Sequence, residues 1–300
     1  MSVKNWLHTM RLKTLPLALS GALIGNFIAL AENKNGFNYL VFSLCITTAV
    51  LIQILSNFAN DYGDFTNGAD TDERTDRLLT TGDISLKQMK FAVYLVGALT
   101  LIFGILLLFF AFGIYSVSFW LMLALGVAGI FSAYFYTAGK KPYGYYGLGD
   151  LFVFVFFGLV SVLGAYFLQT QTINLGIVAL AVAIGLLSVG VLNVNNIRDI
   201  NSDKMKGKNT LPVKMGKSNA LIYHFAILFL SILLIMAFYF YENQAVPYLR
   251  ILMFLALLGI HFVFIKKAAT RMDYNKQLKY LSLSTLFMAF YIGITQILDI

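Results

Sequence analysis

The chain has 300 residues, of which 59% are hydrophobic and only 12% are charged. Its mean hydropathy of +0.77 lies far above that of a soluble globular domain. These values exclude a soluble enzyme or binding module and indicate an integral membrane protein. The one cysteine, Cys45, lies within an apolar stretch, which excludes a disulfide framework and a cysteine metal site.

Nine apolar stretches are long enough to cross the hydrocarbon core of a membrane, which takes about 20 helical residues. The stretches are nearly continuous and lack the alternation of a membrane β-barrel, so we expect helices. The sequence therefore predicts an all-α membrane protein with nine transmembrane helices in a single domain, residues 1–300. In chain order the predicted spans lie near residues 14–31, 39–59, 91–111, 117–136, 150–169, 174–194, 219–240, 247–265 and 279–298.

Lysine and arginine are distributed unevenly between the two sides that these spans define. With a cytoplasmic N-terminus, 20 of the 22 basic residues fall on the cytoplasmic side, and only Lys34 and Arg250 fall on the other. The positive-inside rule predicts this bias, so we expect the N-terminus and the long loops in the cytoplasm. The formal net charge of +8 therefore reflects membrane topology and indicates no nucleic-acid partner.

Two cytoplasmic loops, residues 60–90 and 195–218, are long, polar and rich in Gly, Asp, Asn and Lys. Long loops in compact proteins are usually functional or disordered. The first begins at the end of the second span, where Asn57, Asp61 and Asp64 have the spacing i, i+4 and i+7. This spacing predicts that the three side chains lie on one face of the last helical turns.

The second long loop repeats this pattern at the end of the sixth span. Asn195, Asp199 and Asp203 have the spacing i, i+4 and i+8, which again predicts one helix face. Asn57 and Asn195 are 138 residues apart, with four spans in each unit of the repeat. We therefore expect two four-helix pseudo-repeats plus a ninth helix, with both acidic clusters at the same membrane face. Parallel repeats of this kind tend to place a site at their interface.

Two facing clusters of aspartates predict a divalent cation. Mg²⁺ binds oxygen ligands, uses one or two carboxylates, and completes its coordination with water and phosphate oxygens. Clustered carboxylates beside a low-dielectric bilayer would repel one another strongly without such a cation. Nearby cations could bind the outer oxygens of a phosphate ester, whose apolar tail would lie among the spans. These cations are Arg74, Arg77, Lys206 and Lys208.

Simpler explanations exist for some of these residues. Aspartates in cytoplasmic loops are usually only solvated, but the helix-face spacing and its recurrence disfavour that explanation here. Lys204, Lys206 and Lys208 could also serve the positive-inside rule or contact anionic lipid. His224 and His261 lie on apolar spans, and we predict that they are hydrogen-bonded within the bundle and are not metal ligands.

The motifs "NDYGDFTNGAD" and "NNIRDINSD", on the second and sixth of nine spans, resemble the two aspartate-rich motifs of the UbiA superfamily of intramembrane prenyltransferases. The resemblance covers nearly the whole chain. Three further segments are similar to the menaquinone-pathway branch of the superfamily, in which the acceptor is 1,4-dihydroxy-2-naphthoate. They are "RLKTLPLALSG" (11–21), "YTAGKKPYGYYGLGDLFVFVFFG" (136–158) and "NNIRDINSDKMKGKNTLPVKMG" (195–216).

The resemblance implies a UbiA-like fold, a Mg²⁺ cofactor and a prenyl transfer in the inner membrane of a bacterium, at its cytoplasmic side. Ionisation of a polyprenyl diphosphate would leave an allylic carbocation, which the naphthoate ring attacks. Loss of carbon dioxide then restores aromaticity and yields demethylmenaquinol. The protein would contribute positioning, stabilisation of the leaving group and exclusion of water. The implied metal ligands are Asp61, Asp64, Asp70, Asp199 and Asp203.

The remaining site residues are assigned by charge and by the same resemblance. Tyr136 joins Asp61, Asp64, Asp199 and Asp203 in the expected catalytic set, because its ring could face the carbocation. The expected diphosphate-binding residues are Asn57, Asn60, Arg77, Lys140, Asn195, Asn196, Lys206 and Lys208. Arg11 and Lys13 are expected to approach the carboxylate of the acceptor.

Two positions depart from the superfamily pattern. Gly68 occupies the usual position of the third aspartate, with Asp70 two residues later, and "RTDRLLTTG" lacks the Gly-Pro that precedes the arginine in many relatives.

Two alternative functions remain. A second enzyme hypothesis keeps the fold but changes the acceptor to 4-hydroxybenzoate or another aromatic. A cation-coupled transporter is the non-enzyme alternative. It is disfavoured because the charges crowd one rim and the span centres are nearly uncharged.

Overall fold

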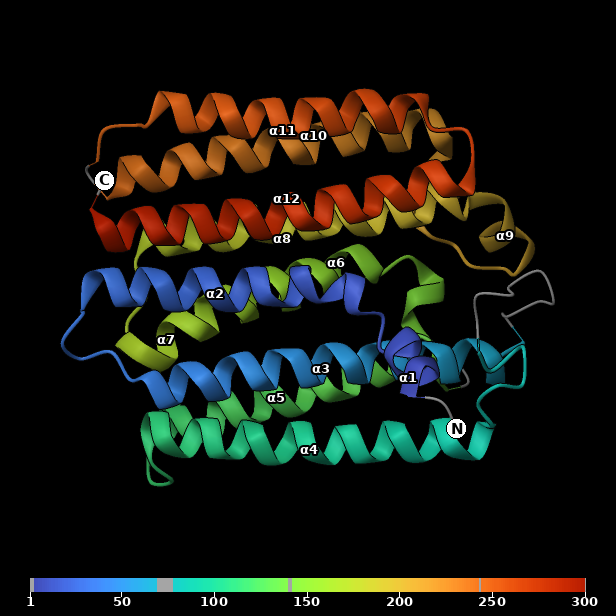
Figure 1. Ribbon diagram of the computed structural model, residues 1–300, viewed down its shortest axis with the longest axis horizontal. Helices are drawn as coiled ribbons and strands as arrows, with labels where there is room; N and C mark the ends of the chain where they lie inside the picture. Colours follow the sequence, from blue (N-terminus) through green and yellow to red (C-terminus); the bar gives the residue numbers. More distant parts are fainter. Residues whose placement is uncertain (1–2, 69–77, 140–141, 243, 300) are drawn as a thin grey trace. The chain divides into compact units, whose positions relative to one another are not determined.

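The computed structural model describes residues 3–68, 78–139, 142–242 and 244–299 (Figure 1). Every regular element in these ranges is a helix, and nine helical segments among them are long and apolar enough to cross a membrane. The prediction of an all-α protein with nine spans is therefore confirmed for the described residues. By its internal contacts the chain divides into two compact units.

Unit 1 comprises Met1–Leu15 and Leu40–Leu148. Its helices are α1 (Val3–Thr9), η1 (Leu12–Thr14), α3 (Tyr39–Thr66), α4 (Leu86–Phe112), α5 (Val117–Phe135) and η2 (Tyr143–Tyr146). A capping box of Ser85 and Gln88 satisfies backbone amides at the start of α4. Trp6 of α1 packs edge-on against the buried Phe58 of α3, with 5.6 Å between ring centroids. This contact attaches the N-terminal segment to α3.

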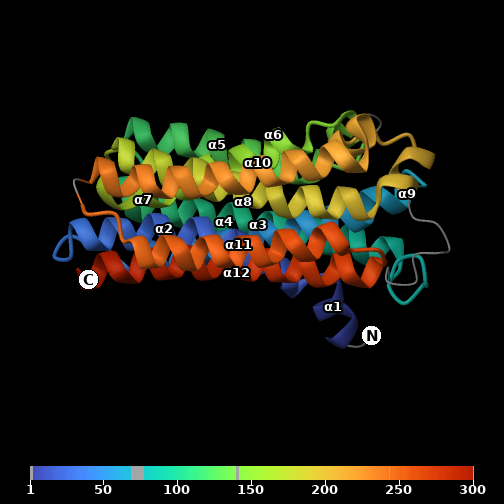
Figure 2. The ribbon, with the colours of Figure 1, turned by 90° about the horizontal axis from the view of Figure 1, so that it is seen from above.

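Unit 2 comprises Pro16–Tyr39 and Gly149–Ile300. Its helices are α2 (Leu15–Glu32), α6 (Gly149–Val153), η3 (Phe154–Leu163), α7 (Gly164–Thr170), α8 (Leu175–Arg198), α9 (Ile200–Met205), α10 (Leu211–Tyr241), α11 (Tyr248–Lys267) and α12 (Arg271–Leu298). In this unit α8 packs against α10, α12 and η3. Figures 1 and 2 show the long helices of this unit running side by side. Helix α8 is the central helix of unit 2, because 67% of its apolar 18-residue stretch is buried inside the protein.

Glycines on α2 allow it to lie directly against η3 and α7. A Cβ on Gly25 would lie 2.3 Å from the carbonyl oxygen of Val162, and one on Gly21 would lie 2.4 Å from Ser161 Oγ. Small residues let membrane helices approach closely, since lipid provides no hydrophobic force between them. The η3 segment is a π-helix of ten residues, a rare element that is frequent at functional sites.

The helices α3 and α12 extend beyond the apolar runs that predicted them. Helix α3 continues to Thr66 instead of ending near residue 59, and α12 begins at Arg271 instead of near residue 279. An apolar run marks only the part of a helix that lies in hydrocarbon, while its polar turns can continue into the interface. Because α3 is extended, Asp61 and Asp64 of the first aspartate motif lie on regular helix.

His224 and His261 are fully buried in unit 2 and bond to each other. Their Nε2 atoms are 2.9 Å apart, and His261 Nδ1 lies 2.9 Å from Oε1 of Gln277. The predicted hydrogen bonding within the bundle is confirmed. Buried polar groups need such partners because an unpaired donor or acceptor costs free energy.

Candidate active site

Asp61 and Asp64 lie near the C-terminal end of α3, one turn apart, and each is only 5% exposed. The unbroken helix confirms that these two carboxylates share one face, as their spacing predicted. An ionised carboxylate with so little access to water requires a cation or several hydrogen-bond donors nearby. The arrangement therefore indicates a site for positive charge.

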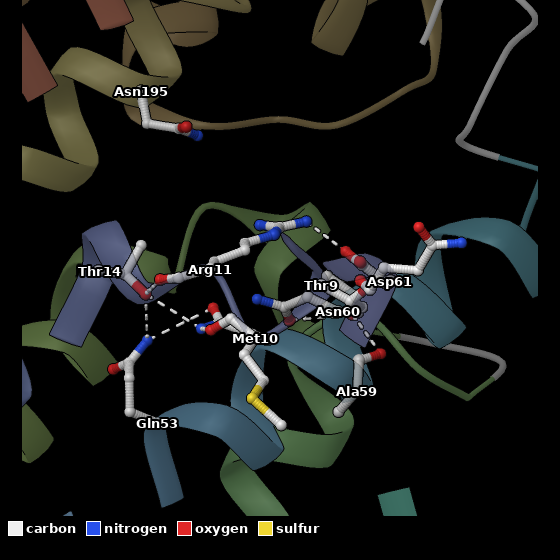
Figure 3. A network of polar contacts seen from close by, with 12 residues as sticks. Thr9, Met10, Arg11, Thr14, Gln53, Ala59, Asn60, Asp61 and Asn195 are labelled. Carbon is white, nitrogen blue, oxygen red and sulfur yellow. Dashed lines mark hydrogen bonds and ion pairs between the residues drawn. The ribbon is translucent and has the colours of Figure 1, made fainter. Parts of the chain in front are cut away.

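One such cation is Arg11, whose guanidinium forms an ion pair with Asp61 (Figure 3). Its Nη2 atom donates to Oδ1 of Asp61 across a sequence separation of 50 residues. The Arg11 side chain is 25% exposed and that of Asp61 is 7% exposed, so the pair is largely shielded from solvent. Arg11 was predicted to bind the carboxylate of an acceptor. The structure places it at a carboxylate of the protein itself.

Asn57 and Gln53 hold the turn that carries Arg11, and Figure 3 shows Gln53 bonded to Thr14. Asn57 Nδ2 donates to the carbonyl oxygen of Met10 at 2.9 Å and to Thr14 Oγ1 at 3.0 Å, while Gln53 Nε2 donates to Thr14 Oγ1 at 3.1 Å. Thr14 Oγ1 in turn donates to the carbonyl oxygen of Arg11 at 2.9 Å. The buried Asn57 thus supports the turn, and its predicted contact with diphosphate stays a prediction.

A tyrosine-rich segment adjoins Asp64. The Tyr145 hydroxyl, on η2, donates to Oδ1 of Asp64 at 3.3 Å. The ring of Tyr143 packs edge-on against that of Tyr136 with 5.4 Å between centroids, and the Gly144 amide donates to the Tyr136 carbonyl at 3.0 Å. Sequence reasoning missed Tyr145, although its signal was present in the "GYYGLGD" motif.

Tyr143 fixes the orientation of this segment. Its hydroxyl donates to the carbonyl oxygen of Ser132 at 2.7 Å. Burial raises the pKa of the Tyr143 hydroxyl well above its usual range, so the group stays protonated and remains a donor. Tyr136, which caps the end of α5, is thereby held half-buried between α5 and η2.

The backbone after α5 lies directly on α3. Thr137 Oγ1 donates to Oδ1 of Asn60 at 3.1 Å, and Asn67 Nδ2 donates to the Thr137 carbonyl at 2.7 Å. A Cβ on Gly63 would lie 2.5 Å from the carbonyl carbon of Thr137. Gly63 therefore allows the contact that brings Asn60, Asp64 and the tyrosine segment together.

Replacing Gly63 by alanine should move the 137–138 backbone away from α3 and disturb the site. We expect a reduction of about tenfold or more in turnover, because small displacements of catalytic groups are costly. Activity and thermal unfolding in detergent should be measured together. The control is Gly126→Ala on α5, where a Cβ meets nothing within 4 Å. Equal activity of the two variants would contradict a role for the Gly63 contact.

The second aspartate cluster lies in unit 2, at the end of α8. Asn196, Asp199 and Asp203 are 5%, 4% and 7% exposed, respectively. Although the amides of Asp199 and Asp203 still donate to the carbonyl oxygens four residues earlier, at 3.1 and 2.8 Å, the helix is interrupted, because α8 ends at Arg198 and α9 begins at Ile200. Asp199 separates them with φ −100° and ψ 10°, a backbone region where many active-site residues are found.

Two arginines hold the carboxylate of Asp199. Arg198 donates to it from Nε at 3.0 Å and from Nη2 at 2.5 Å, and Arg271 Nη1 lies 3.4 Å from Oδ1. Arg198 Nη2 also donates to Oδ1 of Asn195 at 2.7 Å. Sequence reasoning assigned no role to either arginine, although Arg198 directly precedes Asp199 in the "NNIRD" motif.

Lys206 and Lys208 follow Asp203 in a tight turn. The backbone amide of Lys208 donates to the Asp203 carbonyl at 2.9 Å, and Gly207 between the lysines has φ 69°. Both lysines are half-buried. Their proximity to the second cluster agrees with the prediction, and their contact with phosphate stays a prediction.

Four residues with a predicted role, Asp70, Arg74, Arg77 and Lys140, lie outside the described part of the chain, as does the side chain of Lys13. The departure at Gly68 has a structural reason. Gly68 follows the end of α3 with φ 65°, a left-handed conformation that glycine adopts without strain and aspartate adopts less readily. The position expected for a third aspartate in the superfamily is therefore used to end the helix.

The donor sets fit a hard divalent cation. Unit 1 provides Asp61 and Asp64, and unit 2 provides Asp199 and Asp203, so the described part of each aspartate motif has two buried carboxylates. Among the described residues, no three acidic, histidine or cysteine side chains form a closed metal cage. One or two carboxylates are compatible with Mg²⁺, whose remaining ligands are commonly waters and substrate phosphates.

The chain is similar to known proteins over most of its length. A family model described as "UbiA prenyltransferase family" matches residues 18–290. The 1,4-dihydroxy-2-naphthoate octaprenyltransferase of Haemophilus influenzae is 43% identical over 267 residues, which cover 88% of this chain and 86% of that protein. The protein of the same name from Escherichia coli is also 43% identical, over 78% of this chain and 75% of that protein.

Solved structures share the fold over nearly the whole chain. A UbiA homologue from Aeropyrum pernix K1 superposes with a TM-score of 0.69 at 20% identity, covering 100% of this chain and 99% of that one. A UbiA homologue from Archaeoglobus fulgidus bound to GPP and Mg²⁺ has a TM-score of 0.63 at 15% identity, covering 96% and 99%. At these identities the likeness concerns the fold alone.

Proposed function

Because the chain belongs to the UbiA prenyltransferase family, we propose that it transfers a polyprenyl group from its diphosphate to 1,4-dihydroxy-2-naphthoate. The product would be demethylmenaquinol, formed with loss of carbon dioxide during menaquinone biosynthesis. The observation that carries the proposal is the occurrence of two buried aspartate clusters in a chain 43% identical to a naphthoate octaprenyltransferase.

The aspartates would hold the metal and, through it, the diphosphate. Asp61, Asp64, Asp199 and Asp203 are buried carboxylates that suit Mg²⁺, and Asp70 is assigned by the family motif. When bound, Mg²⁺ would supply positive charge that stabilises the departing diphosphate. We further propose that residues 1–300 act as a single prenyltransferase domain, because the family model spans residues 18–290.

Asparagine, lysine and arginine side chains would bind the outer oxygens of the diphosphate. The asparagine side-chain amides would donate hydrogen bonds to diphosphate oxygens. The lysines and the arginine would form charge-assisted hydrogen bonds to them. The proposed residues are Asn57, Asn60, Arg77, Lys140, Asn195, Asn196, Lys206 and Lys208. The lysines and arginine among them would offset part of the negative charge of the aspartates and the substrate, and the metal would offset more of it.

The reaction then requires positioning more than acid–base chemistry. The C–O bond of the allylic diphosphate breaks, and its electron pair leaves with the diphosphate. The acceptor ring carbon that bears the carboxylate forms the new C–C bond. Its bond to the carboxylate then breaks, and that electron pair restores the aromatic ring as carbon dioxide departs. Tyr136, held half-buried against Tyr143, would offer its ring to the allylic cation.

The site is proposed to open to the cytoplasm, in the inner membrane of a bacterium. Support comes from the distribution of basic residues, 20 of 22 of which fall on the side of the aspartate clusters. The prenyl chain would lie among the membrane spans, while its diphosphate remains at the polar rim.

The proposal predicts a metal-dependent product that can be identified directly. Purified protein in nanodiscs should be incubated with Mg²⁺, a polyprenyl diphosphate and either 1,4-dihydroxy-2-naphthoate or 4-hydroxybenzoate. We expect a decarboxylated prenyl product and carbon dioxide from the naphthoate alone, detected by mass spectrometry. The product should disappear with a chelator and return with excess Mg²⁺.

The two acceptor tubes separate the enzyme alternatives. Product from 4-hydroxybenzoate alone would keep the prenyl transfer and replace the acceptor. Full activity after removal of divalent ions would contradict the roles given to the aspartates.

A further inference from the structure

Arg11 has an unusual backbone conformation. Its φ of 49° and ψ of 56° place it in the left-handed region, which few residues other than glycine adopt. Such a strained residue persists only where the surrounding structure over-determines its conformation. Here Asn57, Gln53 and Thr14 supply those surroundings through four hydrogen bonds around the turn.

This turn directs the Arg11 side chain to Asp61 (Figure 3). The two residues come from different elements of unit 1, the turn before η1 and the end of α3, and the ion pair joins them. Asp61 is also a carboxylate that the proposed function gives to Mg²⁺. The strained turn therefore places the guanidinium of Arg11 against Asp61, a proposed metal ligand.

We propose that Arg11 is an exchangeable counter-ion that competes with the divalent metal for Asp61. The inference rests on the proposed function only in assigning Asp61 to the metal. In the metal-free protein the guanidinium compensates the buried carboxylate, whose charge would otherwise be costly. Metal binding at the same oxygen brings two cations onto one carboxylate, and their repulsion at low dielectric displaces the arginine.

The exchange has a thermodynamic consequence. Because the ion pair must break before the metal binds Asp61, the apparent metal affinity is lowered by the stability of that pair. The displaced guanidinium then becomes available to an anionic substrate oxygen, such as the acceptor carboxylate. Metal and acceptor should therefore bind with positive coupling, which is reciprocal.

The first test measures metal binding without turnover. Mn²⁺ binding to the metal-free full chain in nanodiscs should be followed by electron paramagnetic resonance for the wild type and for Arg11→Gln. We expect Arg11→Gln to bind Mn²⁺ about tenfold tighter, and Mg²⁺ to raise its melting temperature more than that of the wild type. The matched control is Lys87→Gln, which removes the same charge from an exposed position in unit 1 and should change affinity less than twofold.

The second test measures the coupling. Affinity for 1,4-dihydroxy-2-naphthoate should rise when Mn²⁺ is added to the wild type, and should not rise in Arg11→Gln. The analogue 1,4-dihydroxynaphthalene lacks the carboxylate, so its affinity should be independent of Mn²⁺ in both proteins. A rise for both compounds would overturn the transfer of Arg11 to the acceptor carboxylate.

The outcomes separate this inference from the function on which it rests. Equal or weaker Mn²⁺ binding by Arg11→Gln, with binding lost in Asp61→Asn, would keep the metal site and overturn the competition. Mn²⁺ binding that Asp61→Asn leaves unchanged would overturn both the metal role of Asp61 and the exchange.

Discussion

Asparagine in place of Asp61 or Asp199 should lower turnover at least about 100-fold while the protein remains folded and inserted. Asparagine keeps the size of the side chain but removes the negative charge that would hold a metal. The two residues are only 5% and 4% exposed, so solvent would compensate little for the lost interaction between carboxylate and metal. Product formation by the purified variants in nanodiscs is the measurement, with melting temperature as the test of folding.

The control for this pair is Asp83→Asn. Asp83 is exposed, accepts a hydrogen bond from Thr81 at 2.6 Å, and lies outside both clusters. Its replacement should leave turnover within about twofold, because exposed surface charges contribute little. Wild-type turnover in either Asp61→Asn or Asp199→Asn would remove that aspartate from the metal site.

The largest effect on stability should come from Gly25→Ala on α2. The new Cβ would lie 2.3 Å from the Val162 carbonyl oxygen and 2.9 Å from Ala165 Cβ. The backbone oxygen cannot turn away as a side chain could, so α2 would have to separate from the π-helix η3 and from α7. We expect a loss of about 1–3 kcal/mol in the free energy of unfolding, measured by denaturation in detergent.

Gly259→Ala on α11 provides the comparison. A Cβ at Gly259 meets nothing within 4 Å, and the residue is inside a regular helix. Alanine there should be neutral or stabilising by up to about 1 kcal/mol, since it favours helix over the unfolded chain. If Gly25→Ala were as stable as Gly259→Ala, close packing of α2 would not limit the stability of unit 2.

Each aspartate cluster has an arginine as its counter-ion, although the two pairs arise differently. Asp199 receives Arg198 from the adjacent position and Arg271 from α12. Asp61 receives Arg11 from a turn 50 residues earlier. A buried carboxylate needs compensation whether or not a metal is bound, so all three arginines are expected to influence metal affinity.

Hydropathy alone determined the nine spans, because a helix in hydrocarbon must be apolar over a fixed length. Spacing alone placed Asp61 and Asp64 on one face, because α3 continues as a regular helix to Thr66. Spacing did not predict the interruption at Asp199, where the chain leaves α8 and restarts as α9. An argument from spacing assumes an unbroken helix. It takes no account of side chains such as Arg198 and Arg271, which bind the residue at the break.

The sequence by itself thus determined the membrane spans, the positions of the aspartate motifs and the family to which they point, since these depend on local composition and spacing. Only the tertiary structure decided that Arg11 pairs with Asp61, that Asn57 supports the turn, and that Tyr145 contacts Asp64. The physical reason is that these contacts join residues far apart in the chain. Their formation depends on close helix packing and on the left-handed turn at Arg11, which no local pattern encodes.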